Sequence, residues 1–226
     1  GRNNAGAGLL RSREKVIEMV RACINATNVP INVKMRLGTG SGHNTALEIT
    51  QRLEDEGVER VCVHGRTLRQ RYSGEADWKQ IKEIVDSVDI PVIANGDIID
   101  AKTALSCLEV TGAGGLMIGR GAIGRPMIFH EIKRDLGWSV GKPPWGDDNI
   151  ASSRLWCWNR YLELSSELYS GIRNKNLKRH AVSFTKGLPG ASKMRVELHS
   201  IADQEKMGDR VKQYLEELTE IETLTL

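Results

Sequence analysis

Apolar residues recur at two alternating spacings along the first half of the chain. One spacing is that of amphipathic helices, predicted over residues 13–27, 44–56, 78–88 and 101–110. The other is that of short β-branched strands, predicted over residues 31–36, 58–64, 90–95 and 114–119. Helices and strands that alternate in this way indicate βαβ units and a parallel sheet that is buried on both faces.

Four such strands are half of the eight that close a β/α barrel. The predicted fold class is therefore α/β, with residues 1–136 forming the carboxy-terminal half of a TIM (β/α)8 barrel. Residues 137–149 are rich in Gly, Pro and Trp and are interpreted as a linker. Residues 150–226 carry helical patterns and no strand pattern, so we expect them to form a small all-helical domain.

The composition excludes several classes of protein. With 40% hydrophobic and 27% charged residues, the 226-residue chain is typical of a globular protein rather than a disordered one. No apolar run is long enough to span a membrane. The four cysteines form neither a CxxC pair nor a zinc-finger spacing with histidine. We therefore expect no metal site, and free thiols in a reducing cytoplasm.

The strand INVKMR carries two cations on one face. Side chains alternate along a strand, so Val33 and Met35 would face the helices while Lys34 and Arg36 would point into the barrel. Cations aimed at a barrel interior are costly unless an anion meets them. That anion is either a carboxylate of a neighbouring strand or a ligand. Arg36 lies at the carboxyl end of the strand, where barrel active sites lie, which favours a ligand.

The following strands also end in residues suited to a binding site. His64 ends the strand VCVH on the predicted inner face, where it has either a structural or a functional role. The last two strands, in PVIANGDI and GLMIGRG, each stop at a glycine, which permits close approach of the backbone. In barrels the loops after the final two strands commonly bind phosphate. We therefore expect the backbone N–H groups of GRGAIGRP and the guanidinium of Arg120 to meet an anion.

Two segments are rich in cations although the net charge is only +3. The loop after His64 contains Arg66, Arg69 and Arg71, with Tyr72 and Trp78 as aromatic neighbours. Residues 171–199 hold seven Lys or Arg side chains and one acidic residue, and the cations that we expect to bind RNA there are Lys175, Lys178 and Arg179. A basic block on a helical domain is typical of a nucleic-acid-binding surface, although a solvated charged face has the same composition.

Six segments together resemble a known family. KMRLG, VHGRT, YSGEADW, IPVIANGDI, LMIGRGAIGRPMIF and KGLPGASKMR are similar, in this order, to motifs of the tRNA-dihydrouridine synthases. These flavin enzymes reduce selected uridines of tRNA. The resemblance extends from AGAGLL to about Leu198. It implies a barrel that carries FMN at its mouth and a helical domain that helps to hold tRNA.

The resemblance also implies roles for individual residues. Lys34 would contact the pyrimidine edge of the flavin, and His64 would also touch the flavin. The ribityl phosphate would be held by Asn95, Gly96, Asp97, Gly119 and Arg120. Arg36, Arg66, Arg69 and Arg71 would meet the RNA. In the family NADPH reduces the flavin, which passes a hydride to C6 of uracil, and a cysteine in a Cys-Pro motif protonates C5.

That cysteine lies a few residues before the segment that matches AGAGLL, and no Cys-Pro occurs in this chain. We therefore expect no catalytic acid within these residues and no turnover by the chain alone. Self-association, or pairing with the missing half barrel, is the expected way to cover the sheet. Two alternatives are a flavin barrel acting on a small molecule, similar to dihydroorotate dehydrogenase, and a non-catalytic RNA-binding remnant. The basic helical segment argues against the small-molecule enzyme.

Overall fold

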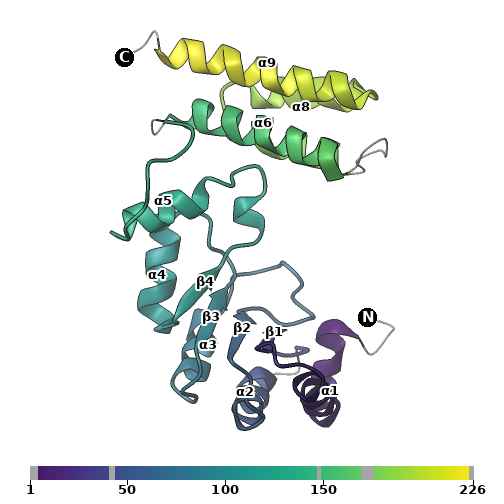
Figure 1. The fold of residues 1–226 in the computed structure, drawn as a ribbon, viewed down its shortest axis with the longest axis vertical. Helices are drawn as coiled ribbons and strands as arrows, with labels where there is room; N and C mark the ends of the chain where they lie inside the picture. Colours follow the sequence, from purple (N-terminus) through teal and green to yellow (C-terminus); the bar gives the residue numbers. More distant parts are fainter. Residues whose placement is uncertain (1–4, 41–43, 147–148, 169–175, 224–226) are drawn as a thin grey trace. The chain divides into compact units, whose positions relative to one another are not determined.

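The computed structural model describes residues 5–40, 44–146, 149–168 and 176–223. The chain divides into two compact units, Gly1–Gly119 and Arg120–Leu226. The elements of the first unit are η1 (Gly6–Arg11), α1 (Arg13–Asn25), β1 (Asn32–Arg36), α2 (Thr45–Asp55), β2 (Arg60–His64), α3 (Trp78–Val85), β3 (Val92–Asn95), α4 (Ala101–Thr111) and β4 (Gly115–Met117) (Figure 1). Those of the second are η2 (Arg120–Ala122), α5 (Ile128–Asp135), α6 (Ile150–Leu168), α7 (Leu177–Thr185), α8 (Ala191–Ser200) and α9 (Gln204–Thr223).

The first unit is a parallel sheet with the strand order β1-β2-β3-β4, as the alternating pattern predicts. Each strand is joined to the next by a helix, and the helices begin at side-chain caps. Asn44, Asp77 and Asp100 accept hydrogen bonds from the backbone N–H groups of Leu47, Gln80 and Thr103. These caps satisfy donors that a helix start would otherwise leave unpaired, and so they fix where each helix begins.

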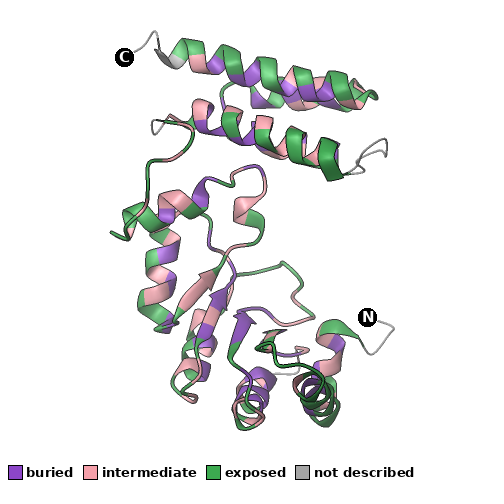
Figure 2. Cartoon of the chain, in the orientation of Figure 1, coloured by how far each residue is buried: buried purple, intermediate pink, exposed green. Residues whose placement is uncertain are grey.

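The two faces of the sheet differ in the way that the alternation predicts. Val61 and Val63 are fully buried on the face that carries the helices, and Met35 is 7% exposed there. Lys34, on the other face, is exposed. The central strands are buried more completely than β1 and β4, as Figure 2 shows. Cys62 on the inner face is buried as well, and its Sγ lies 3.5 Å from the Sδ of Met117 on β4.

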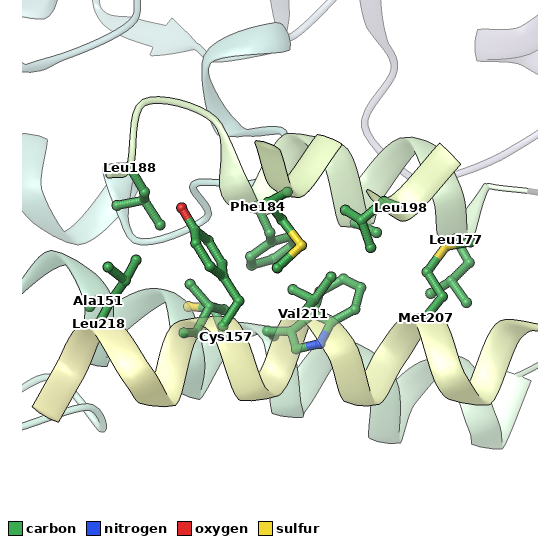
Figure 3. Close-up of a cluster of buried hydrophobic side chains, with 14 of the residues drawn as sticks. Ala151, Cys157, Leu177, Phe184, Leu188, Leu198, Met207, Val211 and Leu218 are labelled. Atoms are coloured by element: carbon green, nitrogen blue, oxygen red, sulfur yellow. The ribbon is translucent and has the colours of Figure 1, made fainter. Parts of the chain in front are cut away.

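The second unit is a helical bundle around one apolar core. Side chains from α6, α7, α8 and α9 meet there, among them Cys157, Phe184, Leu198 and Val211 (Figure 3). Trp158 of α6 is fully buried, stacks on Tyr161 with 5.3 Å between ring centroids, and donates its indole N–H to the Gly208 carbonyl at 3.0 Å. This core confirms the predicted all-helical character of the region.

The boundary between the units lies earlier than the composition indicates. The sequence assigns residues 120–136 to the barrel and 137–149 to a linker, but both belong to the helical unit. Met127 is 3% exposed in the core of that unit. Trp145 makes edge contacts with His130 on one side and Trp156 on the other, at centroid distances of 5.5 and 5.9 Å. The ring of Trp145 therefore packs the segment that the composition predicts to be a linker against the helical unit.

All four cysteines are free thiols, as their spacing predicts. Cys23 is exposed, whereas Cys62, Cys107 and Cys157 are buried. Burial disfavours the charged thiolate and raises the pKa of Cys107 and of Cys157 to about 11, and it raises the pKa of Cys62 as well. None of the helices that the structure describes is long and apolar enough to cross a membrane.

Candidate functional site

The carboxyl ends of the four strands form one edge of the sheet, and polar residues gather there. Strand pairing aligns Arg36 with His64, His64 with Asn95, and Asn95 with Met117. Residues aligned in this way share a face of the sheet. On the same face, two residues nearer the amino ends of the strands, Lys34 is paired with Cys62. Lys34, Arg36 and His64, which the alternation predicts to be on the inner face, therefore share one face of the sheet with Asn95.

The loops at this edge are tied to one another by backbone hydrogen bonds. The N–H of Leu68, in the β2–α3 loop, donates to the Gly38 carbonyl of the β1–α2 loop at 2.8 Å. The N–H of Gly65 donates to the Asn95 carbonyl at 2.9 Å, at the end of β3. The side-chain amide of Asn95 in turn donates to the Met117 carbonyl at 2.7 Å, which joins the ends of β3 and β4.

The two glycines that end the last strands differ in their surroundings. Gly96 has φ +123°, and a Cβ added to it would lie 2.7 Å from the Cβ of Ala76 and 3.0 Å from Cδ2 of His64. The absence of a side chain at Gly96 therefore makes room for Ala76 and for the buried ring of His64. A Cβ added to Gly119 would meet no atom within 4 Å. The space beside Gly96 is thus filled by protein, whereas no close contact of this kind exists at Gly119 among the described residues.

Arg36 donates hydrogen bonds to the backbone of the β2–α3 loop. Its Nη1 donates to the carbonyls of Thr67 and Arg71 at 3.0 and 2.9 Å, and its guanidinium carbon lies 5.7 Å from the centre of the Tyr72 ring. Tyr72 is 60% exposed. A cation under an aromatic ring is attracted by the ring's negative face. Arg36 thus holds an exposed aromatic side chain at the edge of the site.

The arginines of the loop itself fall into two groups. Arg69 and Arg71 are exposed, as expected for side chains that bind RNA. Arg66 is only 3% exposed, and its Nη2 donates to the Gly74 carbonyl at 2.5 Å and to the Asp97 carboxylate at 2.7 Å. This geometry indicates that Arg66 holds the loop in place, rather than contacting RNA as the sequence predicts. The Asp97 carboxylate thus accepts a hydrogen bond from Arg66, although the resemblance implies that Asp97 holds the flavin phosphate.

The cations predicted to bind RNA in the helical unit are only partly described. Lys175 lies outside the described residues. Lys178 donates its ammonium to the His199 carbonyl at 3.0 Å, near the end of α8, where cations are favoured by the helix dipole. Arg179, on the next position of α7, is exposed. Arg179 is therefore the better candidate for an RNA phosphate, and Lys178 also has a structural partner.

Comparison with known proteins identifies the family. Residues 1–220 match the family model described as Dihydrouridine synthase (Dus).

This chain belongs to the dihydrouridine synthase family.

Named relatives agree with that assignment. The chain is 34% identical over 214 residues to a probable tRNA-dihydrouridine synthase 1 of Synechocystis, an alignment that covers 94% of this chain and 59% of the relative. It is 46% identical over 132 residues to tRNA-dihydrouridine synthase B of Vibrio cholerae, covering 58% of this chain and 41% of the relative. For tRNA-dihydrouridine synthase B of Pseudomonas putida the identity is 32% over 214 residues, covering 94% and 62%. The chain thus spans less than two thirds of these relatives.

Family membership confirms the resemblance seen in the motifs and the predicted fold class. The dihydrouridine synthase barrel is a TIM barrel, and the four-stranded parallel sheet of this chain is consistent with part of one. The relatives reported above are named tRNA-dihydrouridine synthases, not small-molecule flavin enzymes.

The pairing of Arg66 with Asp97 is a feature of this site that the sequence pattern alone does not predict. A signal was present. His64 and Asn95 are neighbours in the sheet register, and Arg66 and Asp97 each follow two residues later. Opposite charges placed equally far beyond two adjacent strands are candidates for an ion pair. That inference needs the register, which the sequence pattern does not contain.

Proposed function

We propose that the protein containing this chain reduces uridine to 5,6-dihydrouridine in tRNA in the cytoplasm, with FMN as cofactor and NADPH as reductant. The observation that carries the proposal is the row of Arg36, His64 and Asn95 at the carboxyl edge of the sheet, with Lys34 on the same face. Barrel enzymes hold their reacting groups at this edge. Dihydrouridine synthases are flavin enzymes, and in this proposal the Lys34 ammonium and the His64 imidazole on this face would contact the flavin.

The fit of FMN to these residues can be judged from the donors present. Lys34 offers an exposed ammonium on the inner face, and a Cβ added to Gly119 would meet no atom within 4 Å. Arg120 follows Gly119 directly in the chain and would offer the phosphate a guanidinium. Asp97 fits less well as a phosphate ligand, because a carboxylate repels a phosphate and this one already accepts from Arg66 and from the Ala76 N–H.

In this proposal FMN would supply the hydride for C6 of uracil when bound. The chain's own residues would bind and orient. The positive charge of Lys34 would stabilise negative charge at the pyrimidine edge of the flavin, and such stabilisation is strongest where water is excluded. His64 would line the same face. Arg69, Arg71 and Arg179 would bind RNA phosphates, and Tyr72 offers a surface on which an unstacked base can lie.

Disruption of the gene that encodes this chain tests the proposal. We expect at least one tRNA position to lose its dihydrouridine, as measured by mass spectrometry of digested tRNA. The wild-type gene should restore it, and a gene carrying Lys34→Met should restore much less. Dihydrouridine content that is the same at every position with and without the gene would contradict the proposed function.

The cofactor assignment has a test of its own. Lys34→Met removes the ammonium while keeping a side chain of similar length. A hydrogen bond to a charged group contributes about 1.5–3 kcal/mol, so FMN binding should weaken by about 10- to 150-fold. Flavin fluorescence titration measures this. Lys79→Met, on the exposed face of α3, is the matched control and should leave the dissociation constant unchanged. Equal constants for both variants would remove Lys34 from the flavin site.

A further inference from the structure

Arg66 is a buried cation whose donors are directed at its own loop. Its Nε donates to the Ser73 carbonyl at 3.3 Å, and its Nη2 donates to the Gly74 carbonyl and to Oδ2 of Asp97. Nη1 is buried and makes no hydrogen bond to the described residues. A guanidinium stays charged in proteins, and a buried charge needs a counter-charge. The Asp97 carboxylate, 2.7 Å away, supplies it.

Asp97 is held in an uncommon backbone conformation that directs its carboxylate to the loop. Its φ is +57°, in the left-handed region that residues other than glycine seldom occupy, although aspartate tolerates it better than most. From there Oδ2 accepts from Arg66 and also from the backbone N–H of Ala76, each at 2.7 Å. One carboxylate oxygen therefore binds both the first part and the last part of the β2–α3 loop.

The contacts of this pair join the start of the β2–α3 loop to its end. Arg66 lies near its start, whereas Ser73, Gly74 and Ala76 lie near its end. Trp78, the first residue of α3, adds a hydrogen bond from its indole N–H to the Gly96 carbonyl at 3.1 Å. The residues between the two ends include the exposed Arg69, Arg71 and Tyr72. Whatever fixes the ends of the loop thus also fixes the exposed residues at its tip.

We propose that Arg66 and Asp97 form a positioning pair that fixes the β2–α3 loop against the end of β3, and that neither residue touches cofactor or RNA. The consequence for RNA rests on the proposed function: the pair presents Arg69, Arg71 and Tyr72 to the substrate as a preformed surface. Preformed surfaces bind more tightly because less ordering is needed on binding. The pair thus acts on the substrate through the loop rather than by contact.

Hydrogen exchange of the 226-residue chain without any ligand tests the pair itself. Arg66→Ala and Asp97→Asn should each speed amide exchange over residues 70–77, by a similar factor of about ten or more, because each removes the same link between the start and the end of the loop. The double variant should exchange no faster than either single variant, since residues in one network are not additive. Arg60→Ala, an exposed arginine at the start of β2, is the control and should leave this segment unchanged.

Two results would overturn the pairing. One is acceleration by only one of the two single variants. The other is a double variant whose effect is the product of two independent effects. If Arg66→Ala does not fold, Arg66→Lys and Asp97→Asn decide the question in its place. A lysine keeps the charge but not the planar fork of donors, so loop exchange should stay faster than in the wild type.

tRNA binding at several salt concentrations separates positioning from contact. A residue that neutralises a phosphate contributes to the slope of log affinity against log salt, about 0.7 to 0.9 for each phosphate. Arg69→Ala should reduce that slope. Arg66→Ala should weaken binding and leave the slope unchanged, and Arg66→Lys should not restore wild-type affinity. A reduced slope for Arg66→Ala, with rescue by lysine, would overturn the proposal. Wild-type protein that binds no tRNA would refute the proposed function, while the exchange experiment would still decide on the pair.

Discussion

Replacement of Gly124 by alanine is expected to destabilise the helical unit by more than about 3 kcal/mol. Gly124 has φ +76°, and a Cβ there would lie 2.7 Å from the backbone nitrogen of Phe184 and closer still to the Ser183 carbonyl group. These are backbone atoms near the end of α7, so they cannot turn aside as a flexible side chain would. The segment around Gly124 and α7 would have to separate.

Gly187 provides the matched control for that experiment. It has nearly the same backbone conformation, φ +78°, but a Cβ added there meets no atom within 4 Å. Gly187→Ala should therefore carry only the left-handed backbone cost, about 1–2 kcal/mol. Urea unfolding followed by circular dichroism measures both variants. If the two alanines lower the free energy of unfolding equally, the close contact between Gly124 and α7 is absent in solution.

Trp158→Ala should cost about 3–5 kcal/mol, the usual range for removing a large buried aromatic side chain. Trp158 is fully buried, and its ring lies 5.0 Å from that of Phe184 between centroids. The substitution also leaves the Gly208 carbonyl without its indole donor. The urea midpoint of the helical unit should fall accordingly, with an unchanged slope if unfolding stays two-state.

Trp156, two residues earlier on the same helix, is the control for that substitution. It is 39% exposed and packs edge-on against Trp145, so Trp156→Ala should cost about 1–2 kcal/mol, clearly less than Trp158→Ala. A tryptophan is lost in both variants, so their fluorescence can be compared directly. Equal destabilisation by the two alanines would mean that the packing of α6 differs from that in Figure 3.

Much of the sheet can be predicted from the sequence because its signals are local. Buried parallel strands must be apolar, and β2 and β3 fall within the predicted strands 58–64 and 90–95. On β1 the burial follows the alternation, with Met35 buried and Lys34 exposed, whereas on the central strand β2 the residues of both faces are buried. The predicted strand 114–119 is too long, since β4 ends at Met117. An apolar pattern cannot show where hydrogen bonding to a neighbour stops.

The rest depends on contacts between distant residues. The Gly- and Pro-rich composition around Trp145 resembles a linker, and it is the packing of its ring on His130 and Trp156 that places it in the helical unit. Gly96 and Gly119 each follow an apolar strand in the sequence. A Cβ added to Gly96 would meet His64 and Ala76, whereas one added to Gly119 would meet no atom within 4 Å. Arg66 looks like its neighbours Arg69 and Arg71, and its burial follows from a carboxylate 31 residues away.

The distribution of the thiols limits how copies of this chain can become covalently joined. Cys62, Cys107 and Cys157 are buried, and burial raises the pKa of each thiol. Because thiolate is the reactive form, these three cysteines are both inaccessible and unreactive at neutral pH. Cys23, on the exposed side of α1, is the accessible one. A chain with one accessible thiol can link to a single neighbour. Air oxidation of these 226 residues, when folded, would therefore stop at dimers, and a maleimide dye would attach to them at one known position.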